Sequence, residues 1–190
     1  MAVLKLEIDS LDWWHCGGGR GAGSHLDAVV DLEDGLPYLP GRQLKGLLRE
    51  ACRCLEEWGH LEKPATTFQL FGRPGGPNED RHASLPGILQ VDSARLPADL
   101  RKAILFDAGL KSALFGELFA TALDSSGSAR PKSLRGIQVS VPLRLETTVS
   151  GPDDHFWQVT LRRCFPLVRA LGAHRSRGLG RCILRETDHA

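Results

Sequence analysis

The stretch from Leu36 to Trp58 constrains the fold most, because it changes from extended to helical at one point. Pro40-Gly41 interrupts an extended segment, and the residues after it carry apolar side chains at helical spacing. Gly59 stands where such a helix would end. The pattern predicts an amphipathic helix over residues 44–58, with an apolar stripe of Leu44, Leu47, Leu48, Ala51 and Leu55.

The start of this helix suits an anion. A helix start leaves backbone N–H groups free and carries the positive end of the helix dipole. Lys45 and Arg49 stand one turn apart on the same side, so both cations would lie near those groups. We therefore expect a seat for a polyanion backbone at this point of the chain.

Periodicity predicts the other elements. Apolar and β-branched residues predict strands over 3–8, 88–91, 137–149 and 181–184, and a helix over 156–171 that Pro166 kinks or splits. Residues 10–35 read as an acidic, glycine-rich loop, and residues 95–120 carry a weak helical pattern. The order strand, helix, strand, strand, helix, strand is that of a ferredoxin-like fold. We expect an α+β protein with one ferredoxin-like (RRM-like) domain over residues 1–190 and large inserted loops.

Length and composition exclude several classes of protein. A chain of 190 residues can form one domain with a substantial core. It contains no run of about 20 apolar residues that could cross a membrane, and its first residues lack the build of a secretion signal. Five cysteines without Cys-x-x-Cys spacing indicate neither a disulfide framework nor a zinc site. We expect free thiols and a cytoplasmic location.

The charge is distributed unevenly along the chain. The net charge is only +1, yet residues 130–185 hold eleven Lys or Arg against three acidic residues. Such asymmetry is typical of a basic face on an otherwise neutral domain, which suits nucleic acid. A solvated arginine-rich surface is the alternative.

Residues 171–181 form a second candidate phosphate site, here called the glycine-rich loop. Its three glycines would let the main chain come close to a ligand. Arg175, Ser176, Arg177 and Arg181 supply donors that fit phosphate oxygens. A flexible basic turn is the alternative. If the flanking strands are neighbours in one sheet, this loop should meet the helix start, with Arg177 near Lys45.

Together these segments resemble the RAMP superfamily of CRISPR-associated proteins. Residues 37–46 are similar to its Pro-Tyr-Ile-Pro-Gly-Ser-Ser-Leu-Lys-Gly, with Arg42 and Gln43 in place of two serines. Residues 172–180 resemble its loop Gly-x-x-x-Ser-Arg-Gly-x-Gly, and residues 68–72 resemble its Leu-Phe-Gly turn. His15, followed by Cys16 and glycines, is similar to a His-x-Gly-Gly turn, which implies that His15 faces guide RNA. Ordinary packing of His15 beside two tryptophans is the alternative.

One further likeness points to the backbone subunits of type III effector complexes. Residues 123–135 are similar to their hairpin Ile-Asp-Arg-x-Thr-Gly-x-Ala-x-x-x-x-Leu, with Ser125 and Ser126 in place of the Arg and Thr. The resemblance implies a thumb-like β-hairpin within an insertion at about 95–136. This hairpin would fold over the guide–target duplex, with Arg130 and Lys132 binding RNA.

A last likeness lies in the acidic loop. Residues 25–31 resemble the pattern Gly-Ile-Asp-x-x-Val-x-x-Asp, which implies that Asp27 cuts target RNA. A carboxylate beside a scissile phosphate can hold Mg²⁺ or another divalent cation, or accept the 2′-OH proton. The products would be a 2′,3′-cyclic phosphate and a 5′-OH, with His25 as a second acid–base candidate. A solvated acidic loop is the alternative.

The sequence therefore predicts a guide-RNA-binding backbone subunit of a type III CRISPR-Cas effector complex, an antiviral ribonucleoprotein. It would be a metal-dependent endoribonuclease that cleaves complementary target RNA, assembled with further copies of itself and other effector subunits. The alternative is a non-catalytic RAMP subunit that binds or caps the guide RNA. A nucleotide-binding enzyme built on Gly17–Gly23 is disfavoured, because no βαβ unit surrounds these glycines.

Overall fold

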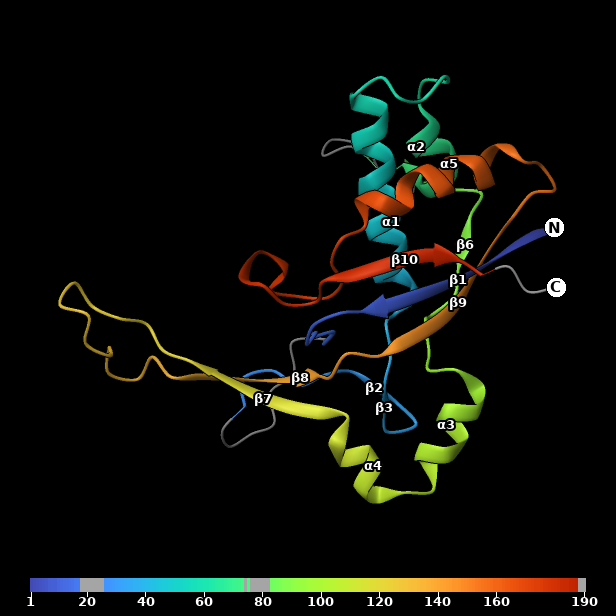
Figure 1. Ribbon diagram of the computed structural model, residues 1–190. Coiled ribbons are helices and arrows are strands. Elements are labelled where there is room, and N and C mark those ends of the chain that lie inside the picture. The colour runs from blue at the N-terminus through green and yellow to red at the C-terminus, as the bar shows by residue number, and fades with distance from the viewer. Residues whose placement is uncertain (18–25, 74, 76–82, 188–190) are drawn as a thin grey trace.

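The computed structural model describes residues 1–17, 26–73, 75 and 83–187 (Figure 1). Its main sheet has four antiparallel strands in the order β10-β1-β9-β6, where β1 is Ala2–Ser10, β6 is Gln90–Val91, β9 is Arg144–Gly151 and β10 is Cys182–Glu186. In β1, Leu4, Leu6 and Ile8 are buried at every second position, so one face of the sheet forms the core. The register pairs Leu6 with Thr147 on one side and with Glu186 on the other.

Two helices cover that face, α1 (Gly41–Glu57) and α5 (Phe156–Cys164) (Figure 1). Residues at helical spacing in α1 join the core with the leucines of β1, as do Trp157 and Leu161 of α5. The short α2 (Thr66–Phe71) packs on α1. The helix α1 ends before Gly59, which takes the left-handed backbone conformation (φ +73°).

A second group of elements leads away from the sheet. Helices α3 (Ala98–Leu105) and α4 (Ala108–Ala113) precede β7 (Phe115–Ala120), which pairs antiparallel with β8 (Arg135–Ser140). We call β7, β8 and residues 121–134 between them the arm, which extends far from the main sheet (Figure 1). Short elements complete the structure, namely β2 (Leu32–Glu33), β3 (Leu36–Pro37), β4 (Gly72–Arg73), β5 (Leu85–Pro86), and the 3₁₀ turns Phe165–Leu167 and Arg175–Arg177.

The mixed α and β composition is confirmed, with two local corrections. The single strand predicted over 137–149 is wrong: β8 ends at Ser140 and β9 begins at Arg144. Pro142 lies in the break, where the chain passes from the arm to the main sheet. Because proline has no N–H to donate, it interrupts the hydrogen bonding of a strand. The weak helical pattern over 95–120 resolves into α3, α4 and β7. As predicted, the segment containing Pro166 leaves the α-helix, since α5 ends at Cys164 and a 3₁₀ turn follows.

Among the described helices, none has the length and apolarity that a membrane span requires.

Candidate nucleic-acid interface

Strand β8 connects the arm to two of the predicted site residues. One edge of β8 pairs with β7, and its other edge binds segments from the N-terminal part of the chain. Trp14 and Ser140 exchange backbone hydrogen bonds of 3.0 and 2.8 Å, which places His15 beside the strand. The backbone of Ala28 forms a parallel bridge with Ile137, which places Asp27 beside the start of the same strand.

His15 is held rigidly by β8. Its side chain is only 4% exposed, and Nδ1 lies 2.6 Å from the main-chain oxygen of Gln138. A carbonyl oxygen only accepts, so Nδ1 carries the proton and Nε2 is left as the other polar atom of the ring. A Cβ added to Gly17 would lie 2.7 Å from Nε2, so glycine is needed where the chain passes the ring.

Asp27 is exposed and is bound to the start of β8. Its N–H donates to the Gly136 oxygen at 2.7 Å, and its Oδ2 accepts the Gly136 N–H at 2.9 Å. The loop is also held by Gln138, whose N–H donates to the Ala28 oxygen and whose Oε1 accepts the Val30 N–H at 3.2 Å. Gln138 was not singled out from the sequence, where its only signal is a polar residue inside a predicted strand.

The glycine-rich loop leans on the same segment. The Ala173 N–H donates to the His15 oxygen at 2.7 Å, and a Cβ on Gly172 would lie 2.2 Å from that oxygen. A Cβ on Gly180 would lie 2.0 Å from the Leu171 oxygen, whereas one on Gly178 would meet nothing within 4 Å. Two of the three glycines therefore serve packing within the protein, and only Gly178 faces open space as the phosphate-loop interpretation expected.

Helix α1 and the glycine-rich loop meet at an open cleft of about 550 Å³. His15 stands at its floor, and the exposed Arg175 reaches it from the loop. Ser176 and Arg177 are also exposed on the adjoining 3₁₀ turn. The cleft is lined by His15, Gly17, Gln43, Gly46, Leu47, Glu50, Gly172, Ala173 and Arg175. The expected meeting of helix and loop thus occurs, but through a different face of the helix.

Lys45 lies on the opposite flank of α1. Its Nζ donates to the Leu89 oxygen at 2.8 Å, just before β6, and Lys45 does not line the cleft. Burial, and then the charge of Arg49 on the same flank, lower the pKa of Lys45. The expectation that Lys45 and Arg177 share one groove is wrong, because Lys45 and the glycine-rich loop flank different sides of the helix.

The start of α1 is also covered. The Gly41 N–H donates to Ser93 Oγ at 3.1 Å, and a Cβ on Gly41 would lie 2.3 Å from the Val91 oxygen. The Pro-Gly sequence therefore lets the helix start pack against the end of β6. That donor is therefore used within the protein, so the Gly41 N–H is not one of the free N–H groups on which the predicted phosphate seat depended.

Ion pairs reduce the basic surplus of residues 130–185. Arg144 and Arg185 pair with Glu7 and Asp9 on the uncovered face of the main sheet. Arg162 pairs with Glu186, and Arg181 pairs with Asp12 at 3.1 Å. The predicted basic face is therefore narrower than the count suggested. Within the described part of the chain, seven of the eleven cations form no ion pair, namely Arg130, Lys132, Arg135, Arg163, Arg169, Arg175 and Arg177.

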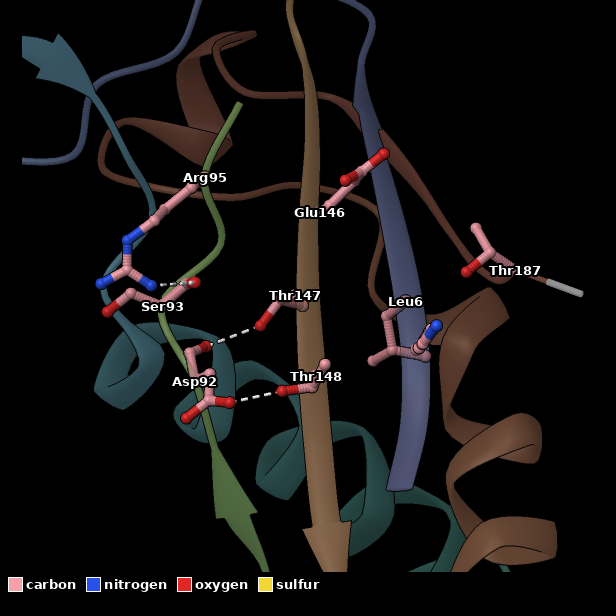
Figure 2. A pocket seen from close by; sticks show the side chains of 9 residues that line it. Leu6, Asp92, Ser93, Arg95, Glu146, Thr147, Thr148 and Thr187 are labelled. Carbon is pink, nitrogen blue, oxygen red and sulfur yellow. Dashed lines mark hydrogen bonds between the residues drawn. The ribbon is translucent and has the colours of Figure 1, made fainter. Parts of the chain in front are cut away.

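A second hollow lies over β1, β9 and the segment after β6, with a volume of about 360 Å³ (Figure 2). Several of its polar side chains have partners within the protein: Thr147 Oγ1 donates to the Asp92 main-chain oxygen at 2.8 Å, and Arg95 pairs with Glu33 outside the hollow. Acidic and basic residues balance here, in Lys5, Asp92, Arg95 and Glu146. It contains none of the predicted RNA-binding residues, and its charge does not favour a polyanion.

Asp27 was also predicted to hold a divalent cation. Across residues 1–17, 26–73, 75 and 83–187, no group of three or more His, Cys, Asp or Glu side chains is arranged to hold a metal ion. His25 and residues 18–23 of the glycine-rich stretch Gly17–Gly23 lie outside the described residues.

Comparison with known proteins places this fold. The sequence model of the RAMP superfamily matches residues 7–183, and no curated protein matches the sequence. The structure is similar to a chain of the type III-B Cmr-beta complex bound to cognate target RNA, with a TM-score of 0.72 at 11% identity over 98% of this chain and 97% of that chain. A chain of the apo Cmr-beta complex is also similar, with a TM-score of 0.66 at 12% identity over 98% of this chain and 97% of that chain. A chain of a type IV-B CRISPR complex has a TM-score of 0.57 at 14% identity over 100% of this chain and 92% of that chain.

Proposed function

This chain belongs to the RAMP superfamily, and we propose that it is a guide-RNA-binding backbone subunit of a type III CRISPR effector complex. The observation that carries the proposal is the cleft in which His15, one face of α1 and the glycine-rich loop lie together. These segments are far apart in the sequence. His15 and the glycine-rich loop were predicted to contact RNA or to bear phosphate-binding donors, whereas the predicted cations of α1, Lys45 and Arg49, lie on its other flank. The sheet order β10-β1-β9-β6 with α1 and α5 on one face supports a ferredoxin-like domain as the scaffold.

Guide RNA would bind mainly through phosphates and sugars. Arg175 lines the cleft, and Ser176 and Arg177 follow it in the same 3₁₀ turn with exposed side chains. Arg181 pairs with the partly exposed Asp12. Such an exposed ion pair is weak and can exchange for phosphate. The arm, with Arg130 and Lys132 at its tip, would reach over the duplex formed with target RNA. Binding of this kind tolerates changes in the RNA sequence, and its affinity falls as the salt concentration rises.

Target cleavage would use Asp27 as the proton acceptor. Oδ2 is engaged by Gly136, and Oδ1 has no hydrogen-bond partner within the described residues. In the proposed step the target 2′-oxygen bonds to its own phosphorus while the bond to the 5′-oxygen breaks. Asp27 takes the 2′-OH proton and the leaving 5′-oxygen takes a proton from water, which yields a 2′,3′-cyclic phosphate and a 5′-OH.

The proposed partners are guide RNA, complementary target RNA, other copies of the chain and further effector subunits in the cytoplasm. The likeness to chains of Cmr-beta, whose structure contains cognate target RNA, supports this assignment.

A direct test combines binding and cutting. The full chain is titrated with guide-like RNA in a gel shift, and complementary RNA is then added with and without Mg²⁺, which also tests the divalent cation that the sequence resemblance implies. We expect binding, followed by a cut that leaves a cyclic phosphate. Binding without any cut would favour the non-catalytic RAMP subunit, and failure to bind RNA would contradict both functions.

A further inference from the structure

A groove continues from the cleft along helix α1. One wall is formed by Leu47, Ala51, Cys54 and Trp58, and the other by residues 167–170, enclosing about 430 Å³. The cleft and the groove share Leu47, Glu50 and Arg175, so they form one continuous depression. Residues from Gln43 to Trp58 at successive helical turns line it, which gives it a length of about 22 Å along the helix.

Trp58 presents an exposed aromatic surface at the far end of the groove. It follows the last residue of α1 and is 59% exposed, whereas Trp14 and Trp157 are completely buried. The His60 ring meets it edge-on, with centroids 6.5 Å apart and an interplanar angle of 87°. Because His60 approaches edge-on, the two rings do not stack on one another. An exposed indole beside cations is the usual platform for an unstacked nucleobase.

The charges along the groove favour an RNA occupant over an apolar protein segment. Arg169 is exposed on the wall opposite Trp58 and has no ion-pair partner in the described part of the chain, and Arg175 stands at the junction with the cleft. The one carboxylate, Glu50, receives hydrogen bonds of 3.1 and 2.6 Å from Arg53, which offsets its charge. A polyanion with bases would satisfy both the indole, by stacking, and the guanidinium groups, by charge-assisted hydrogen bonds.

We propose that this groove carries single-stranded RNA onward from the glycine-rich loop, with a base stacked on Trp58 and a phosphate bound by Arg169. The inference rests on the proposed RNA-binding function and extends the binding track along α1. Trp58 supplies stacking, which is independent of base identity, and Arg169 supplies charge. The groove would therefore add affinity without adding sequence preference.

Two probes separate stacking from charge. The full chain is titrated with fluorescently labelled oligouridine and with inorganic polyphosphate, which has the charge but no bases. Trp58→Ala should weaken oligouridine binding by about 5- to 150-fold, the range for loss of one base–aromatic stack, and leave polyphosphate binding unchanged. Trp58→Phe keeps a ring and should recover much of the loss. Arg169→Gln should weaken binding of both probes.

The matched control is Phe106→Ala, which removes an aromatic side chain that is 93% exposed at the end of α3, far from the groove. Both probes should bind this variant as they bind the wild type, and circular dichroism should show all variants folded. Equal oligouridine binding by wild type and Trp58→Ala would contradict the proposed binding of RNA in the groove, while leaving the proposed function intact. A wild-type chain that binds neither probe would contradict the proposed function itself. If Trp58→Ala disturbs only self-association, the occupant is a protein and the inference is wrong.

Discussion

Asp27 and Gly136 exchange two hydrogen bonds, of 2.7 Å from the Asp27 N–H and 2.9 Å from the Gly136 N–H to Asp27 Oδ2. This pair joins an exposed carboxylate of the acidic loop to the start of β8 in the arm, 109 positions further along the chain. The position of the carboxylate is therefore coupled to the position of the arm. If the arm holds target RNA, as proposed, the position of the arm also determines the position of Asp27 relative to that RNA.

Asp27→Asn should separate chemistry from structure. The amide oxygen can still accept the Gly136 N–H, so folding and RNA binding should be close to wild type. The uncharged amide cannot take the 2′-OH proton, so cleavage should fall by about 100-fold or more. Single-turnover cleavage of a complementary strand by the full chain loaded with guide RNA measures this. Asp31→Asn is the matched control and should cut normally. If Asp31→Asn abolishes cutting while Asp27→Asn cuts normally, the catalytic acid is Asp31 and the assignment of Asp27 is wrong.

Gln138 should act as a positioning residue for the same loop. Gln138→Ala removes the acceptor of the Val30 N–H and should loosen the loop, at a cost of about 1 kcal/mol typical of one hydrogen bond. We expect slower cleavage with guide RNA affinity unchanged, because His15 contacts the backbone oxygen of Gln138, which the substitution retains. Gln138→Glu keeps an acceptor and should restore the rate. Equal rates in all three proteins would show that the bond does not position Asp27.

Lys45 should contribute chiefly to stability. Lys45→Met keeps the aliphatic stem but leaves the Leu89 oxygen without its 2.8 Å donor, which should lower the free energy of unfolding by about 1–3 kcal/mol. Urea denaturation measures this change. Arg49→Met, one turn along the same flank, is the control. The salt dependence of RNA binding should be unchanged by Lys45→Met; a slope reduced by about one would show instead that the amine contacts a phosphate.

Arg177 should contact a phosphate. Arg177→Ala should weaken guide RNA binding and reduce the slope of log affinity against log salt by roughly one. Arg144 is a suitable control because it is also exposed but pairs with Glu7 and Asp9 on the uncovered face of the main sheet. Arg144→Ala should leave the slope nearly unchanged. Identical slopes for wild type and Arg177→Ala would remove Arg177 from the interface.

Features that depend on local spacing were predictable from the sequence. The apolar repeat of Leu44, Leu48 and Leu55 gave the helix α1, because side chains four residues apart share one helical face. Pro166 was expected to interrupt the second helix, since proline lacks the N–H that a helix interior needs. The RAMP assignment also followed from short motifs, which keep their order along the chain.

Relations between distant segments were decided only by the tertiary structure. The spacing of Lys45 showed which way it points relative to the apolar stripe of α1, but not that Leu89 lies on that flank and the glycine-rich loop on the other. The cation count in residues 130–185 could not reveal that β1 supplies carboxylates to Arg144 and Arg185. Sheet pairing brings such residues together across more than a hundred positions. The sequence by itself determined the family, the helix α1 and most strands of the main sheet, because these depend on local patterns. The ion-pair partners of the charged side chains were set by long-range packing, which local periodicity does not encode.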